Sequence, residues 1–250
     1  MRVYLTGGVA IEHEEKLVEE RELAGRQGRL AFAFLASERH RPITKDELVA
    51  VVWPDTPPRE TETALSAILS KLRTAFRKVS PAATVEVRSG TIQLRLPPDV
   101  WIDLEHAANS IDEAEGALRA GKTCDAWSHA VTLVVIARRP FLAGEEAPWI
   151  EARRVRLRSL LVRGLHILSQ ITALNGEGSL ALQYATEIIE LEPFQETGYR
   201  HLMQVHAQMG NRGEALRVFG KCRELFRDEL GADPSQETER VFLEILRAGQ

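Results

Sequence analysis

The chain has 250 residues with a formal net charge of −4, and its length allows two domains. It contains no secretory signal, membrane span, P-loop or Gly-x-Gly-x-x-Gly motif, and no residues assemble a nucleophile, a base and an orienting group. We therefore expect a cytoplasmic protein that is not an enzyme, with no catalytic residues, no cofactor and no membrane partner.

The cysteine and histidine residues do not suggest a metal site. Cys124 and Cys222 lie far apart and have no Cys-x-x-Cys partner, so we expect both to be buried, reduced thiols. The seven histidines show no spacing typical of metal ligands, and His201 and His206 are too far around a helix to share one face. We expect no bound metal.

The first half of the chain begins with elements that precede a longer helix. Residues 1–23 contain short β-prone runs that predict a small N-terminal sheet, and residues 25–37 carry an apolar helical face. After a break at His40–Pro42, residues 44–47 (TKDE) form a capping box and predict a short helix. That helix is expected to end at Trp53-Pro54, because proline cannot supply the next backbone amide.

Residues 59–78 predict a long amphipathic helix with an unusual outer face. One apolar stripe has helical spacing and comprises Leu65, Ile68, Leu69, Leu72 and Phe76. From Thr63 onward the opposite face has no carboxylate and holds Thr63, Ser66, Ala67, Ser70, Thr74 and Arg77, flanked by Lys71, Arg73 and Lys78. Small residues would let the helix approach base edges, and the polar and basic ones can bind bases or phosphates. The alternative is an ordinary surface helix with a basic end that the helix dipole favours.

The segment after this helix predicts a β-hairpin. Residues 84–88 and 91–96 alternate apolar and polar side chains around Ser89-Gly90, and Arg88 lies beside the turn, where a wing tip would meet a phosphate or a minor groove. Residues 59–95 hold 7 basic and 3 acidic residues, so positive charge is concentrated there. The order of elements predicts a winged helix-turn-helix whose long helix enters the major groove of DNA. Six glutamates between residues 12 and 22 must then face away from DNA.

The second half predicts an all-α domain of tetratricopeptide-like repeats. We place the boundary at Pro97-Pro98, giving a DNA-binding domain of residues 1–98 and a helical domain of residues 99–250. Gly121, Gly176 and Gly210 are each followed five residues later by alanine and then a large apolar residue, and the last two glycines are 34 residues apart. With 17 basic and 22 acidic residues in 101–250, this half is not expected to bind nucleic acid. The fold class is therefore mainly α, with a small α+β part.

The chain resembles the Streptomyces antibiotic regulatory protein (SARP) type of bacterial transcriptional activator along nearly its whole length. In the first half the resemblance is carried by residues 25–30 (GRQGRL), 46–48 (DEL), 52–54 (VWP), 57–58 (PP), 63–65 (TAL) and 70–73 (SKLR). In the second half it is carried by residues 137–142 (ARRPFL), 148–151 (PWIE), 213–218 (GEALRV) and 229–235 (ELGADPS). Many members of the family have an aromatic residue directly after the wing glycine, where this chain has Thr91 after Gly90.

The resemblance implies an OmpR-type winged helix followed by a bacterial transcriptional activator domain. It implies binding to promoter direct repeats by two protomers side by side, a homodimer on DNA, and activation through contacts to the sigma and alpha subunits of RNA polymerase. The contact surfaces would be the loop at residues 53–58 and the helical domain. It also implies that Lys71, Arg73 and Arg77 contact phosphates. The residues that it places toward bases are Thr63, Ser66, Ala67, Ser70 and Thr74.

Two other functions are compatible with the sequence. The winged domain could be a protein-binding module of an interaction scaffold, with its basic helix against an acidic partner. The helical array could instead sense a ligand in its groove, which is compatible with DNA binding. The sequence names no such ligand.

Overall fold

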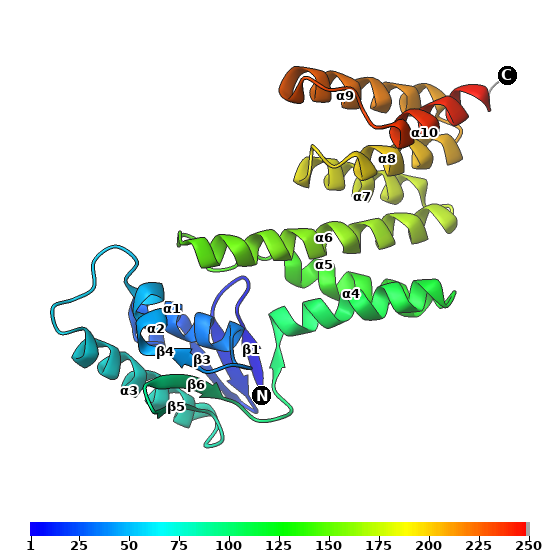
Figure 1. Ribbon diagram of the computed structural model, residues 1–250. Coiled ribbons are helices and arrows are strands. Elements are labelled where there is room, and N and C mark those ends of the chain that lie inside the picture. Colours follow the sequence, from blue (N-terminus) through cyan, green and yellow to red (C-terminus); the bar gives the residue numbers. More distant parts are fainter. Residues whose placement is uncertain (249–250) are drawn as a thin grey trace. The chain divides into compact units, whose positions relative to one another are not determined.

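The computed structural model describes residues 1–248 (Figure 1). The chain forms two compact units, one of residues 1–108 with 136–157 and the other of residues 109–135 with 158–250, the last two of which lie outside the described residues. These units do not coincide with a division after residue 98. The first unit includes residues 136–157, which belong to the second half of the sequence.

The first unit contains a four-stranded sheet in the order β3-β2-β1-β7. Strands β1 (Arg2–Tyr4), β2 (Ala10–His13) and β3 (Lys16–Glu19) pair antiparallel, while β7 (Trp101–Ile102) pairs parallel to β1. The short 3-10 helix η1 (Glu20–Glu22) follows β3. The sheet predicted from residues 1–23 is therefore present, and a strand beyond residue 98 completes it.

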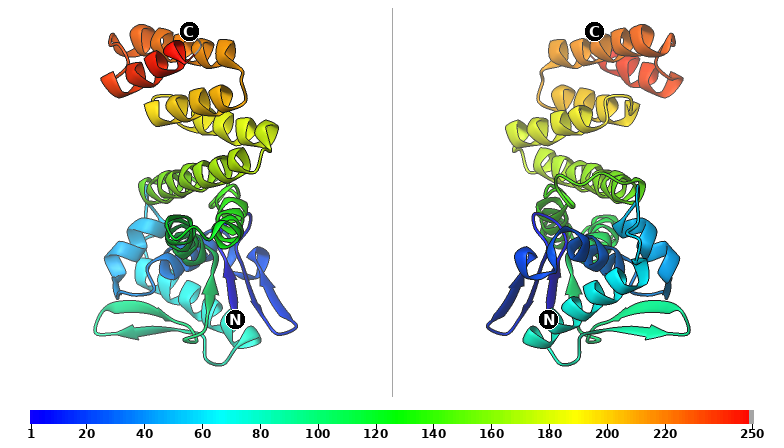
Figure 2. Two further views of the ribbon diagram at one scale, coloured as in Figure 1. Left: turned by 90° about the vertical axis from the view of Figure 1, so that its right-hand side faces the viewer. Right: turned by 90° about the vertical axis from the view of Figure 1, so that its left-hand side faces the viewer.

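The elements of the winged helix follow in the expected order. They are α1 (Gly25–Ser37), β4 (Ile43–Thr44), α2 (Lys45–Val52), α3 (Thr61–Val79), β5 (Thr84–Arg88) and β6 (Thr91–Arg95). Strands β4, β6 and β5 form a second, antiparallel sheet. Both views of Figure 2 show the β5–β6 hairpin and the N-terminal strands on opposite sides of α3, which packs against β5 and against β2 and β3.

Local sequence explains where α2 begins and ends. The Thr44 hydroxyl accepts a hydrogen bond from the Glu47 amide at 3.1 Å, as an N-cap residue does. The helix ends at Val52, before Trp53-Pro54, as the sequence predicts. The Glu47 carboxylate also binds the guanidinium of Arg41, at 2.5 and 3.1 Å.

The stripe predicted for α3 forms the core of the winged helix. Leu65, Ile68, Leu69, Leu72 and Phe76 are all buried, together with Ala75 and Val79. Helix α1 is buried from Leu30 to Ala36, and the Phe32 and Phe76 rings lie 5.3 Å apart, which joins α1 to α3. An amphipathic helix becomes stable mainly through such packing of its apolar face.

The remaining described helices form a stacked helical array, and the predicted tetratricopeptide-like arrangement is confirmed. They are α4 (Asp103–Arg119), α5 (Thr123–Ala137), α6 (Pro148–Leu174), α7 (Gly178–Leu191), α8 (Glu196–Gln208), α9 (Arg212–Leu230) and α10 (Gln236–Arg247). Figure 1 shows α7 to α10 stacked layer on layer. Helices α4, α5 and α6 each contribute residues to both compact units.

The glycines of the sequence repeat have the same role in three turns. Gly121, Gly176 and Gly210 follow α4, α6 and α8 with φ between 72° and 79°, a conformation that glycine adopts without steric cost. In each turn the amide of the next residue bonds a carbonyl five residues earlier, which closes the helix end. The alanines five residues after each glycine, Ala126, Ala181 and Ala215, are fully buried.

Candidate DNA-binding surface

The structure exposes most of the residues predicted to contact DNA along one face of α3. The exposed members are Thr63, Ser66, Ala67, Ser70, Lys71, Thr74 and Arg77. They lie on the side of the helix opposite the buried stripe, so the apolar and polar faces inferred from helical periodicity are both present. From Thr63 to the end of α3 no carboxylate interrupts this surface.

Arg73 differs from the other basic residues of α3. Its side chain is half-buried, and its Nε donates a hydrogen bond to the carbonyl oxygen of Val85 in β5 at 2.8 Å. Arg73 therefore ties α3 to the hairpin. Its assignment to a phosphate stays a prediction for the N–H groups other than Nε, since periodicity could not show that a strand distant in sequence supplies an acceptor for Nε.

Two further side chains of this face lie along the helix itself. The Thr74 hydroxyl donates to the Ser70 carbonyl at 3.1 Å, and the Arg77 Nε donates to the Arg73 carbonyl at 3.3 Å. Both residues remain exposed. The Thr74 oxygen keeps acceptor capacity, and the Arg77 guanidinium keeps N–H groups for other acceptors.

The hairpin holds Arg88 at its tip. Ser89 and Gly90 form the two-residue turn with φ of 48° and 80°, the backbone of a type I′ hairpin. Arg88 is exposed, and its Nη2 lies 3.4 Å from a Glu86 oxygen. The tip is also anchored to the start of α2, because the Lys45 amide bonds the Gly90 carbonyl at 3.4 Å.

A hollow of about 250 Å³ separates α3 from the hairpin. It is lined by Lys45, Glu62, Leu65, Ser66, Leu69, Arg73, Val87 and Ile92. Lys45 and Val87 are absent from the residues predicted from sequence. Lys45 forms an ion pair with Glu62 at 3.1 Å, and Val87 is 41% exposed. Only the meeting of α2, α3 and the hairpin brings them to this surface.

Part of the acidic N-terminal segment engages basic side chains of the fold. Glu22 pairs with Lys78 at the end of α3, at 2.7 Å, and Glu20 pairs with Arg29 of α1. The hydrogen bond from Lys78 lowers the pKa of Glu22. Lys78 is thus partly neutralised at the C-terminal end of the basic face.

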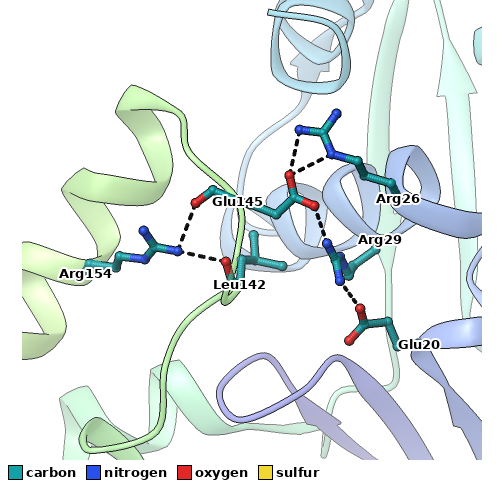
Figure 3. A network of polar contacts seen from close by, with 6 residues as sticks. All are labelled: Glu20, Arg26, Arg29, Leu142, Glu145 and Arg154. Carbon is teal, nitrogen blue, oxygen red and sulfur yellow. Dashed lines mark hydrogen bonds and ion pairs between the residues drawn. The ribbon is translucent and has the colours of Figure 1, made fainter.

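A segment of the helical region, residues 136–157, is built into the first unit (Figure 3). Its Glu145 side chain is 4% exposed and lies between two arginines of α1: Arg26, at 2.6 and 2.8 Å, and Arg29. Burial alone would raise the pKa of Glu145, but the bonds from Arg26 and Arg29 outweigh it and lower the pKa. This carboxylate is therefore ionised and holds the segment to α1.

Arg154 of α6 stabilises the same segment from its other side. Its guanidinium donates to the carbonyl oxygens of Leu142 and Glu145 at 2.8 and 2.9 Å (Figure 3). It also donates to the carbonyl oxygen of Phe141 at 3.1 Å. The Trp149 ring packs edge-on against Phe34 of α1 at 5.2 Å and against Phe141 at 5.8 Å. Polar and aromatic contacts together fix the segment.

Asp103 links the N-terminal sheet to the start of α4. Its side chain is buried and accepts hydrogen bonds from the amides of Leu5 and Thr6, both at 2.8 Å, and from the Thr6 hydroxyl at 2.9 Å. Burial raises the pKa of Asp103, although these bonds oppose the shift. The turn after β1 also contacts residues 136–157, because Gly7 donates its amide hydrogen to the Pro140 carbonyl at 2.9 Å.

The thiols and possible metal ligands were also located. Cys222 is buried, and its burial raises its pKa to about 12, but Cys124 is exposed, so the expectation of two buried thiols is wrong for Cys124. Among residues 1–248, no three or more His, Cys, Asp or Glu side chains gather as metal ligands would. Over the same residues no helix has the length and apolarity needed to cross a membrane.

A winged helix with a basic exposed helix face, followed by tetratricopeptide-like repeats, defines a class of regulatory protein. The model of the bacterial transcriptional activator domain matches residues 102–246. The chain therefore belongs to the bacterial transcriptional activator domain family, and it is a regulator of the SARP type.

Two curated relatives are similar to nearly the whole chain, and one solved structure shares its fold. The regulatory protein AfsR of Streptomyces coelicolor is 28% identical over 89% of the chain, and AfsR of Streptomyces griseus is 26% identical over 90%. The chain spans 22% of the length of each. EmbR of Mycobacterium tuberculosis, solved with a low-affinity phosphopeptide, has the same fold, with a TM-score of 0.85 and 18% identity. That match covers 99% of this chain and 65% of EmbR.

Proposed function

We propose that this protein is a sequence-specific DNA-binding transcriptional activator that inserts α3 into the major groove at promoter direct repeats. The observation that carries this proposal is the exposed face of α3, which from Thr63 to Lys78 offers small, hydroxyl and basic side chains and no carboxylate. Such a face can approach base edges while its cations neutralise phosphates. Membership in a family of transcriptional activators supports the same function.

Within this proposal the residues divide by the contact they make. The bases would be read by Thr63, Ser66, Ala67, Ser70 and Thr74. The phosphates would be bound by Lys71 and Arg77, by Arg88 at the wing tip, and by those N–H groups of Arg73 that do not hold Val85. The wing and α3 would thus contact one duplex from two elements.

Activation would follow from contacts with the transcription machinery. We propose that two protomers bind adjacent repeats as a homodimer on DNA. The loop at residues 53–58 and the helical domain would hold the sigma and alpha subunits of RNA polymerase, in the cytoplasm and at the nucleoid. Residues 1–98 would serve as the DNA-binding part and residues 99–250 as the activator part. Transcription in vitro from a selected promoter, with and without the protein, tests recruitment separately from binding.

The DNA contacts are tested by selecting bound fragments from genomic DNA and measuring affinity against salt concentration. Lys71→Ala should weaken binding by a similar factor on every sequence and reduce the logarithmic salt slope by about 1. Ser66→Ala should instead change which sequence is preferred, because base contacts specify and phosphate contacts position. Lys221→Ala, which removes an exposed lysine of α9, is the matched control and should change neither. A selection that enriches no fragment, with no measurable affinity at low salt for any promoter repeat, would refute the proposal.

A further inference from the structure

A cavity of about 320 Å³ lies between two helices of the second unit. Facing positions of α6 and α8 line it at helical spacing, so that one face of each helix contributes. The lining residues are His166, Gln170, Ala173 and Leu174 from α6, and His201, Gln204, Val205 and Gln208 from α8. None of them is assigned a part in DNA binding.

The cavity is polar but carries no charge. None of its lining residues is an aspartate, glutamate, lysine or arginine. The His166 and His201 rings meet edge to face with centroids 5.1 Å apart. Burial lowers the pKa of both, and that of His201 falls to about 4 with a further contribution from His166. Both imidazoles are therefore neutral near pH 7, when each offers one donor and one acceptor nitrogen.

One hydrogen-bonding atom beside the cavity lacks a partner. The Nε2 of His201 is buried, and within residues 1–248 it makes no hydrogen bond. A buried polar atom without a partner is costly, so a molecule that supplies one gains that interaction on binding. The three glutamine amides are exposed, and each offers two donors and a carbonyl oxygen. Ala173, Leu174 and Val205 add apolar surface.

We propose that this cavity binds a small uncharged molecule with amide, carbonyl or hydroxyl groups on an apolar frame. The cavity volume of about 320 Å³ falls at the lower end of the range typical of small-molecule sites, which suits a ligand of small-metabolite size. The lining residues offer a phosphate or carboxylate no cation and an ammonium no carboxylate, so the site selects against either charge. It is separate from α3 and does not depend on the proposed DNA binding.

The test uses the whole chain and three probes of one shape: neutral benzamide, anionic benzoate and cationic benzylamine. Ligand-observed NMR should detect benzamide binding with a dissociation constant in the millimolar range, as expected of so small a molecule. Benzoate and benzylamine should bind much more weakly. Equal binding of all three probes, or no binding of benzamide, would overturn the proposal.

A substitution at the cavity rim locates the site. Gln204→Glu exchanges a lining amide for a carboxylate at an exposed helix position, where folding is not at risk. The substitution should lower the affinity for benzamide about tenfold, because it removes an amide donor. It should raise the affinity for benzylamine, because the new carboxylate attracts the ammonium group. Gln183→Glu, on the exposed side of α7 and outside the cavity, should leave both affinities unchanged. If the two variants behave alike, the probes bind elsewhere and the cavity is not the site.

Discussion

The basic residues of α3 have different environments although they share a helix. Lys71 is exposed, whereas the Nε of Arg73 is held by the Val85 carbonyl at 2.8 Å. Arg73 thereby links α3 to β5 of the hairpin. A charged residue beside the exposed face of α3 can therefore hold a neighbouring element as well as contact a ligand directly.

At this scale we expect Arg73→Ala and Lys71→Ala to differ in stability. Removing Arg73 leaves the Val85 carbonyl without its side-chain donor and should cost about 1 kcal/mol of unfolding free energy. Removing the exposed Lys71 should change it by less than about 0.5 kcal/mol. Urea unfolding of both variants measures the difference. Equal stabilities would mean that the Arg73 bond contributes nothing to the hairpin.

Among the elements, the segment of residues 136–157 packs against the winged helix, which its own sequence does not predict. It contributes Glu145 to α1, Trp149 to an aromatic cluster with Phe34, and the Pro140 carbonyl to the turn that follows β1. Buried ion pairs hold elements together chiefly because losing one partner leaves the other unpaired. The segment therefore belongs physically to the winged-helix unit, although it lies within the family domain.

The prediction for this element compares two neighbouring glutamates. Glu145→Gln removes the charge that faces Arg26 and Arg29 and should lower the unfolding free energy by about 2 kcal/mol, less than for a fully buried pair because Arg26 is 53% exposed. Glu146→Gln, one residue further along and exposed, should have no measurable effect. Thermal unfolding of the two variants provides the comparison. An unchanged unfolding free energy for Glu145→Gln would show that the Arg154 hydrogen bonds and the aromatic contacts hold the segment without this ion pair.

For the whole molecule, the folding unit and the sequence division differ. A chain cut after Pro98 loses β7, the Asp103 carboxylate and residues 136–157. The amides of Leu5 and Thr6 would lose their acceptor, and Phe34 would lose its contact with Trp149. The repeats depend on their neighbours in another way, because each helix pair buries its apolar face only against the next.

We therefore expect a fragment of residues 1–98 to be much less stable than the first unit within the full chain. Small domains have a low free energy of unfolding. Loss of a strand and of a buried polar contact should therefore leave the fragment partly or wholly unfolded at room temperature. Circular dichroism melts of the fragment and the full chain test this. A cooperative transition of the fragment at the temperature of the full chain would support an independent domain of residues 1–98.

The sequence by itself determined the elements and the class of fold. Helical periodicity identified α1 and α3, the Thr44 cap and the Trp53-Pro54 stop bounded α2, and the Ser89-Gly90 turn marked the hairpin. The glycine and alanine repeat predicted the helical array. Each of these features depends on residues close in sequence, because backbone conformation and capping are local properties.

The tertiary structure alone decided which distant residues meet. It placed the Val85 carbonyl against Arg73, Lys45 and Val87 beside α3, Glu145 against α1, and His166 against His201. Such contacts join residues between 12 and 119 positions apart. No local pattern encodes them, since they arise only when packing brings apolar faces together. The sequence thus indicated which face of α3 is available for binding, and the packing determined which of its side chains are free to bind.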